Sequence, residues 1–191
     1  MLTGRLTKFY RPRRRARNAA YPDYVYEAQE QLSKADFVAD VLKRTSLLEE
    51  DLDFTLSLYF CGPGRHFTYI DIVSSHMQFN AKIKIFESIP VRKNLKSRVQ
   101  ALSGLRRFQR IRNTVAHPIL VRPSKVQALC DDQIIRAILL QFHKPIEAEF
   151  RCVRRSLDHI TRSREWRPDL TAKKPDKVDQ IHNFMHRITY D

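Results

Sequence analysis

Residues 97–117 read SRVQALSGLRRFQRIRNTVAH and hold the clearest helical pattern of the chain. Apolar side chains recur at three- and four-residue steps, which is the spacing of one face of an α-helix. They are Val99, Leu102, Leu105, Phe108, Ile111 and Val115. The helix should end near His117, because Pro118 disfavours helical dihedral angles at the residue before it.

Similar patterns extend outward from this helix. A long helix is expected from Ser33, which with Asp36 resembles a capping box, to the breaker at residues 61–64. Shorter helices are expected over residues 67–74 and 79–89, an extended connection over 119–121, and a last helix over 131–165, kinked at Pro145. With only 4 glycines, the chain is predicted to be all-α, a bundle of four to five helices with a kinked long C-terminal helix.

The same patterns divide the chain into three parts. Residues 1–23 should form a basic, flexible arm, residues 24–166 the helical domain, and residues 167–191 a polar linker followed by a short terminal helix. Nothing approaches 18 consecutive apolar residues, so no membrane span is expected. The N-terminus lacks the apolar core of a signal peptide. The three widely spaced cysteines fit buried thiols in a reducing compartment, so a cytoplasmic location is expected.

Positive charge is concentrated in two segments. The net charge of +14 comes from residues 1–22, with seven basic side chains, and residues 88–130, with ten, and neither segment contains an acid. The rest of the chain is therefore slightly negative. Charge segregated in this way offers a positive surface to a polyanion such as nucleic acid. The acidic run at Glu49, Glu50, Asp51 and Asp53 is expected to be solvated surface rather than a metal site, because these side chains do not share one helix face.

One face of the 97–117 helix carries side chains suited to phosphate. Arg106, Arg110, Asn113 and His117 follow the spacing of a single helix face, with no carboxylate among them. Arg112 falls at the edge of the apolar stripe, where an arginine is costly unless it is paired or faces a partner. Ideal geometry separates Arg112 from His117 by roughly 140° around the helix. The two would act on one phosphate only if the helix ended early or if a second subunit supplied the other half.

Arg112 and Asn113, followed after two residues by Ala116 and His117, resemble the Arg-Asn-x-x-x-His motif of HEPN domains. The resemblance covers roughly residues 30–163. It implies a homodimer whose two motifs meet in a cleft and cleave RNA without a metal, in toxins, phage defence or RNA processing, with a cognate antitoxin as a further possible partner. Arg112 and His117 would be catalytic, and Asn113 would orient them. Ile119 stands where one subgroup has a tyrosine, so nucleotidylation there is not expected.

The chemistry implied by the resemblance needs no cofactor and no metal. A histidine can act as base or acid at neutral pH, and an arginine can stabilise charge on the phosphate oxygens. The RNA-binding side chains are expected to be basic residues of the helix, the loop that follows it and the arm. They are Arg106, Arg107, Arg110, Arg122, Arg11, Arg13, Arg14 and Arg15. The looser spacing of an arginine and a histidine also occurs at Arg136–His143 and Arg154–His159, where it is interpreted as accidental.

Two other functions remain open at this point. The same domain could bind RNA or mask a protein without catalysis. The chain could also be a DNA-binding or architectural protein that uses its basic arm, with His117 merely ending a helix. The 2′-hydroxyl separates RNA cleavage from the DNA-binding alternative, because DNA cannot be cut by this chemistry.

Overall fold

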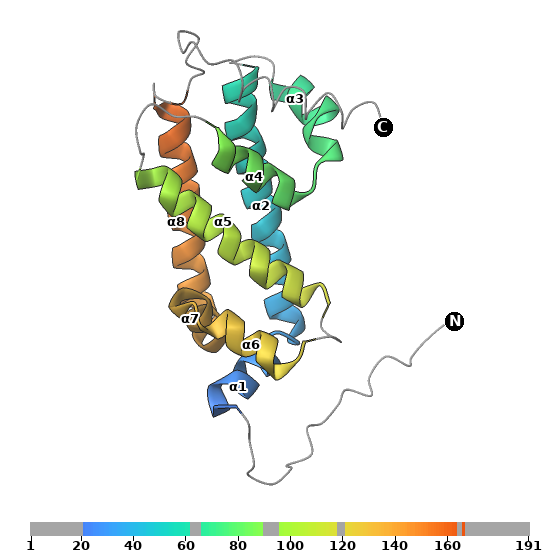
Figure 1. Ribbon diagram of the computed structural model, residues 1–191, viewed down its shortest axis with the longest axis vertical. Helices are drawn as coiled ribbons and strands as arrows, with labels where there is room; N and C mark the ends of the chain where they lie inside the picture. Colours follow the sequence, from blue (N-terminus) through green and yellow to red (C-terminus); the bar gives the residue numbers. More distant parts are fainter. Residues whose placement is uncertain (1–20, 62–65, 90–95, 118–120, 164–165, 167–191) are drawn as a thin grey trace, which may run out of the picture.

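The computed structural model describes residues 21–61, 66–89, 96–117, 121–163 and 166, and the fold is all-α, as predicted (Figure 1). Residues 1–20 of the expected arm and the expected terminal helix lie outside the described residues, and Asp23, expected at the end of the arm, already belongs to the first helix. The helices are α1 (Asp23–Gln31), α2 (Ala35–Phe60), α3 (His66–Ile72), the short 3-10 helix η1 (Ser74–His76), α4 (Phe79–Ser88), α5 (Lys96–Val115), α6 (Pro123–Cys130), α7 (Gln133–Gln141) and α8 (His143–Arg162).

The core lies where α2, α5 and α8 pack together. Helices α2 and α8 run along the length of the molecule, and α5 crosses them obliquely (Figure 1). The predicted apolar stripe of α5 is buried at Leu105, Phe108, Ile111 and Val115. The prediction was wrong only for Val99, which is 56% exposed. In the first turns of α5 the buried residue is instead Ala101, and Arg98 donates to the carbonyl of Phe86 on α4.

Gly104 sets the close approach of α5 to α8. A Cβ at this position would lie 2.1 Å from Cγ2 of Val153 on α8. Any larger side chain would therefore push the two helices apart, and packed cores tolerate such expansion poorly. This contact positions the polar face of α5 relative to α7 and α8.

The predicted start of the long first helix was wrong in detail. Helix α2 begins at Ala35 after Lys34, and no side chain caps it. The hydroxyl of Ser33 instead donates to the carbonyl of Glu30 at 2.6 Å, at the end of α1. Helix α1 was not predicted, because its buried stripe consists only of Val25 and Ala28.

The expected kink in the last helix is a full break, and it lies at Phe142 rather than at Pro145. Phe142 has a φ of 53°, a left-handed backbone that ends α7 and starts α8. Pro145 then falls in the first turn of α8, where its missing N–H removes no helical hydrogen bond. Proline marks the start of α8, not a bend within it.

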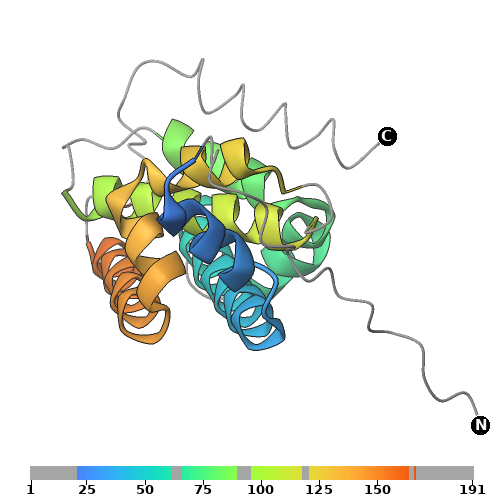
Figure 2. The ribbon, with the colours of Figure 1, turned by 90° about the horizontal axis from the view of Figure 1, so that it is seen from below.

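Helix α6 was also missed by the sequence reading. It begins at Pro123, the residue type favoured at the first helical position, and buries Val126, Leu129 and Cys130. Figure 2 shows α1, α6 and α7 gathered at one end of the molecule, and α6 lies beside the C-terminal end of α5 in both views (Figures 1 and 2).

The cysteines and the helix lengths bear on two further expectations from the sequence. Cys130 is buried but Cys152 is exposed, so the expectation of buried thiols was wrong for Cys152. Within the described residues, no helix combines the length and apolar character that a membrane crossing requires.

Candidate nucleic-acid interface

The C-terminal end of α5 brings His117 to the surface. The helix ends at Val115, the amide of Ala116 donates to the carbonyl of Arg112 at 2.9 Å, and the amide of His117 donates to that of Thr114 at 3.3 Å. The tighter last turn and the following proline explain why the helix stops here. Both Asn113 and His117 are exposed, as their positions on the polar face predicted.

A hollow of about 400 Å³ opens beside this helix end. Asn113 and His117 line it together with Arg110 from α5 and Lys125 from α6. Its remaining walls are small or apolar: Thr114, Val121, Ala128 and Leu129. None of the described residues that line the hollow carries a carboxylate, so Arg110, Lys125 and the amide of Asn113 can donate to an anion there. We call this the His117 hollow.

Lys125 is the residue of this hollow that the sequence reading missed. Its exposed side chain comes from α6, which was not predicted. The available signal was Pro123 at a first helical position, followed by apolar residues at three-residue steps. That signal was weak, because α6 has only 8 residues.

Arg112 lies outside the His117 hollow. Its side chain is half-buried, as the apolar-edge position predicted, and makes no hydrogen bond or ion pair with another described residue. Helix α5 includes Arg112 and ends at Val115, two residues before His117, and of these two side chains only that of His117 lines the hollow. A single chain therefore brings Asn113 and His117 together but leaves Arg112 aside.

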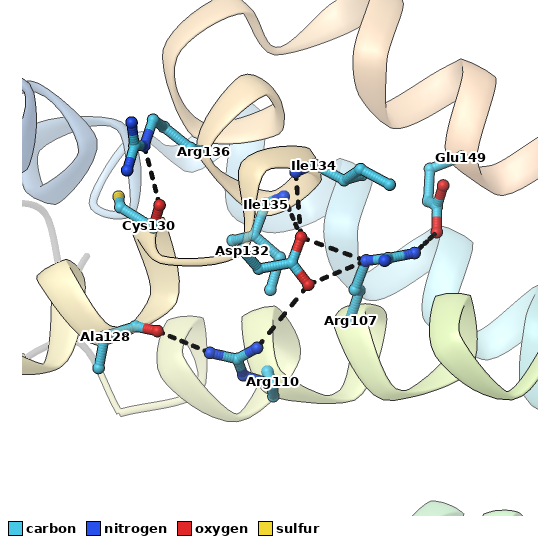
Figure 3. A network of polar contacts seen from close by, with 9 residues as sticks. All are labelled: Arg107, Arg110, Ala128, Cys130, Asp132, Ile134, Ile135, Arg136 and Glu149. Carbon is cyan, nitrogen blue, oxygen red and sulfur yellow. Dashed lines mark hydrogen bonds and ion pairs between the residues drawn. The ribbon is translucent and has the colours of Figure 1, made fainter.

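The arginines in the middle of α5 are held by carboxylates from other helices. Figure 3 shows Arg107 between Asp132 and Glu149, with its Nε 2.9 Å from Oδ2 of Asp132 and its Nη1 2.9 Å from Oε1 of Glu149. Arg106 pairs with Glu87 of α4 at 2.5 Å. The middle of the helix, free of acids in the sequence, is thus paired with acids from other helices, whereas its C-terminal end is not.

Arg110 connects this network to the His117 hollow. Its Nη2 donates to the carbonyl of Ala128 at 2.8 Å, and its Nη1 lies 3.9 Å from Oδ2 of Asp132 (Figure 3). Burial raises the pKa of Asp132, but hydrogen bonds from Arg107 and from the amides of Ile135 and Ile134 outweigh it and hold the pKa below its usual value. Asp132 therefore stays charged at neutral pH.

The other expected RNA-binding residues divide into two groups. Arg122 is exposed just before α6, and its side chain bonds to no other described residue. Arg11, Arg13, Arg14 and Arg15 lie outside the described residues. Among the described arginines expected to bind RNA, Arg106 and Arg107 are held by carboxylates at hydrogen-bond distance, whereas Arg110 and Arg122 are not.

The acidic run on α2 is solvated surface only in part: Glu50 is exposed as expected, but the other three acids are paired. Asp53 is 7% exposed, and the ammonium of Lys82 on α4 lies 2.8 Å from both Asp53 and Glu49. Burial raises the pKa of Asp53 even though Lys82 opposes the shift. Asp51 pairs with Arg154 of α8 at 2.6 Å. These acids join α2 to its neighbours, and no three potential metal-ligating side chains cluster in the described part of the chain.

Comparisons with protein-family models, with curated proteins and with solved structures found no match. The interpretation of the His117 hollow therefore rests on the side chains that line it and on the motif resemblance alone.

Proposed function

We propose that this chain is a metal-independent endoribonuclease of the HEPN type that acts on RNA as a homodimer. One observation carries the proposal. His117 and Asn113 lie at an exposed helix end, in a hollow that Arg110 and Lys125 also line and that no carboxylate lines. An imidazole among cationic donors suits a phosphodiester that must be bound and cleaved.

The reaction is an internal transesterification. His117 removes the proton of a ribose 2′-hydroxyl, the oxygen attacks the adjacent phosphorus, and the 5′-oxygen leaves with a proton. Lys125 and Arg110 stabilise the charge that develops on the non-bridging oxygens. The ribose supplies the nucleophile, so the chemistry requires no metal-bound hydroxide.

Arg112 enters this scheme through a second subunit. Its half-buried side chain has no partner among the described residues, and it lies outside the hollow of its own chain. A symmetric dimer would bring Arg112 of one subunit toward the RNA bound by the other. Such an enzyme fits a toxin, phage-defence or RNA-processing role, and a toxin would require a cognate antitoxin in the cytoplasm.

The test is cleavage of mixed RNA by the purified full-length protein in the presence of a chelator. Wild type should leave 2′,3′-cyclic phosphate ends. His117→Ala should slow cleavage about 100-fold or more, the usual contribution of a general acid or base, while RNA binding persists. Arg112→Ala should have a similar effect on cleavage.

His143→Ala is the matched control. His143 is exposed and follows Arg136 at the same loose spacing, but Arg136 donates to the carbonyl of Cys130 and stacks over Tyr24. This variant should cleave like wild type. Equal cleavage by His117→Ala, or a requirement for magnesium, would reject the mechanism.

The position of Arg112 also favours a second candidate, a domain that binds RNA without cutting it. The His117 hollow would then hold a phosphate of the backbone, and the basic residues would supply affinity. This candidate would be supported over the first if wild type bound RNA but did not cleave it under any condition, and if Lys125→Ala lost that binding.

A further inference from the structure

A second hollow lies at the opposite end of α5, where the start of this helix meets α8. It measures about 290 Å³. Polar and titratable side chains from both helices line it: Ser97, Gln100, Cys152, Arg155, Ser156 and His159. As in the His117 hollow, no carboxylate lines it. Helix α5 has 20 residues, so about 30 Å separates its two ends.

Ser156 is the first sign that this hollow holds a polar ligand. Its side chain is 6% exposed, and its hydroxyl bonds to no other described residue. Several other helical hydroxyls return a hydrogen bond to the carbonyl one turn earlier, as Thr45 does to Val41 and Ser88 to Lys84. The Ser156 hydroxyl is not sealed from solvent although the residue is almost fully buried, so it opens onto the hollow and is free to bond to a group that enters there.

Arg155 supplies positive charge, and His159 supplies a second side chain that can donate to a ligand. They lie one turn apart on the exposed surface of α8, and neither forms an ion pair with a described acid. The neighbouring arginines of the same helix are all paired. Arg151 pairs with Glu147, Arg154 with Asp51, and Arg162 with Asp158. The one arginine of α8 left without an acid among the described residues is therefore the one at the hollow.

The start of α5 adds a second source of positive potential. The first amides of a helix have no helical acceptor and point outward along the axis, where they favour an anion. The first turn of α5 contains no acidic residue to satisfy them, and the hydroxyl of Ser97 lies in that turn. Arg155 therefore faces a helix start that also attracts negative charge.

We propose that this second hollow binds a phosphate group. The guanidinium of Arg155 and the imidazole of His159 donate to its oxygens, and the hydroxyls of Ser97 and Ser156 donate from the two helices. The volume accommodates a phosphate with an attached sugar, which fits either the end of a nucleotide or a unit of a nucleic-acid backbone. This site does not depend on the proposed cleavage, because binding of phosphate here requires neither His117 nor Arg112.

Cys152 provides a local reporter. Its exposed thiol lines the same hollow, whereas Cys130 is buried. A phosphate bound to Arg155 would occupy the space beside this thiol and block the access of iodoacetamide to it. Alkylation of Cys152, followed by peptide mass spectrometry with Cys61 as the internal reference, therefore measures occupancy.

The experiment uses the full chain with inorganic phosphate, adenosine monophosphate and short DNA, at ionic strength matched with sodium chloride. Phosphate should slow alkylation of Cys152 relative to chloride. Arg155→Gln should weaken the protection about ten-fold, as expected for the loss of one charge-assisted hydrogen bond. Arg151→Gln removes the same charge one turn away and should leave the protection unchanged.

The experiments with DNA identify the source of the phosphate. Their result does not depend on cleavage, because DNA lacks the 2′-hydroxyl that the proposed cleavage requires. Protection by 5′-phosphorylated DNA and by the mononucleotide, but not by 5′-hydroxyl DNA, assigns the site to a terminal phosphate. Equal protection by both DNAs assigns it to the backbone. An unchanged alkylation rate in wild type with every phosphate probe, or equal effects of Arg155→Gln and Arg151→Gln, would overturn the proposal.

Discussion

The middle and the C-terminal end of α5 carry similar basic and polar side chains in opposite surroundings. In the middle, Arg106 and Arg107 meet carboxylates from α4, α7 and α8. At the end, Asn113 and His117 line an open hollow, and their side chains bond to no other described residue. Basic residues that look equivalent in the sequence thus divide into those that hold helices together and those available to a ligand.

This division changes which arginines are expected to bind RNA. Arg107 is 22% exposed and satisfied by two acids, so RNA would have to displace an existing network to reach it. Arg110 is 44% exposed and keeps part of its guanidinium free beside the His117 hollow. The positive surface is therefore smaller than the acid-free segment implies.

The largest effect on stability is expected for Arg107→Met. This substitution leaves Asp132 and Glu149, which are 21% and 11% exposed, without their shared partner. The free energy of unfolding should fall by about 2–3 kcal/mol, less than for a fully buried pair because solvent reaches part of the network. Urea unfolding monitored by circular dichroism measures the change.

Arg106→Met is the control for this prediction. Its ion pair with Glu87 joins side chains that are 53% and 45% exposed, so its loss should cost at most about 1 kcal/mol. If the free energy of unfolding fell equally in the two variants, the network around Arg107 would stabilise the fold no more than a surface ion pair does.

A smaller, pH-dependent effect is expected for Asp132→Asn. The pKa of Asp132 is depressed in the folded state, so its charge contributes stability that is present above the unfolded pKa of about 3.9 and lost as the pH falls through the folded pKa. Asparagine keeps the cap on the amides of Ile134 and Ile135 but removes the charge. The free energy of unfolding of wild type should exceed that of Asp132→Asn most at neutral pH. The difference between the two should disappear as the pH falls into the acid range. A gap that stays constant across urea titrations from neutral pH into acid would contradict the role of the charge.

The sequence predicted the long helices well because their apolar stripes are strong. Leu48, Leu52 and Leu56 of α2 are buried as expected, and so are Phe150, Val153 and Leu157 of α8. Helices α1 and α6 have too few apolar residues for the same signal, and they form because they pack against each other and α7. The break at Phe142 depends on one left-handed residue, which no local pattern indicated.

The candidate site was predictable only along one helix. Helical spacing correctly put Asn113 and His117 on one exposed face, and Arg112 at the apolar edge. The partners of the other arginines could not be predicted, because Glu87, Asp132 and Glu149 reach α5 from other helices. Spacing identifies a face of a helix, whereas the charge of that face depends on tertiary contacts.

The smallest effects on stability are expected at the end of α5. Asn113→Ala and His117→Ala each remove an exposed side chain that bonds to no other described residue, so each should change the free energy of unfolding by no more than about 0.5 kcal/mol. Alanine also has the higher helix propensity, which favours a slight gain at position 113. Urea unfolding of both variants beside Arg107→Met measures the contrast directly. A loss above about 1 kcal/mol at either residue would mean that the end of α5 also stabilises the fold, and loss of RNA cleavage in that variant could then no longer be assigned to chemistry.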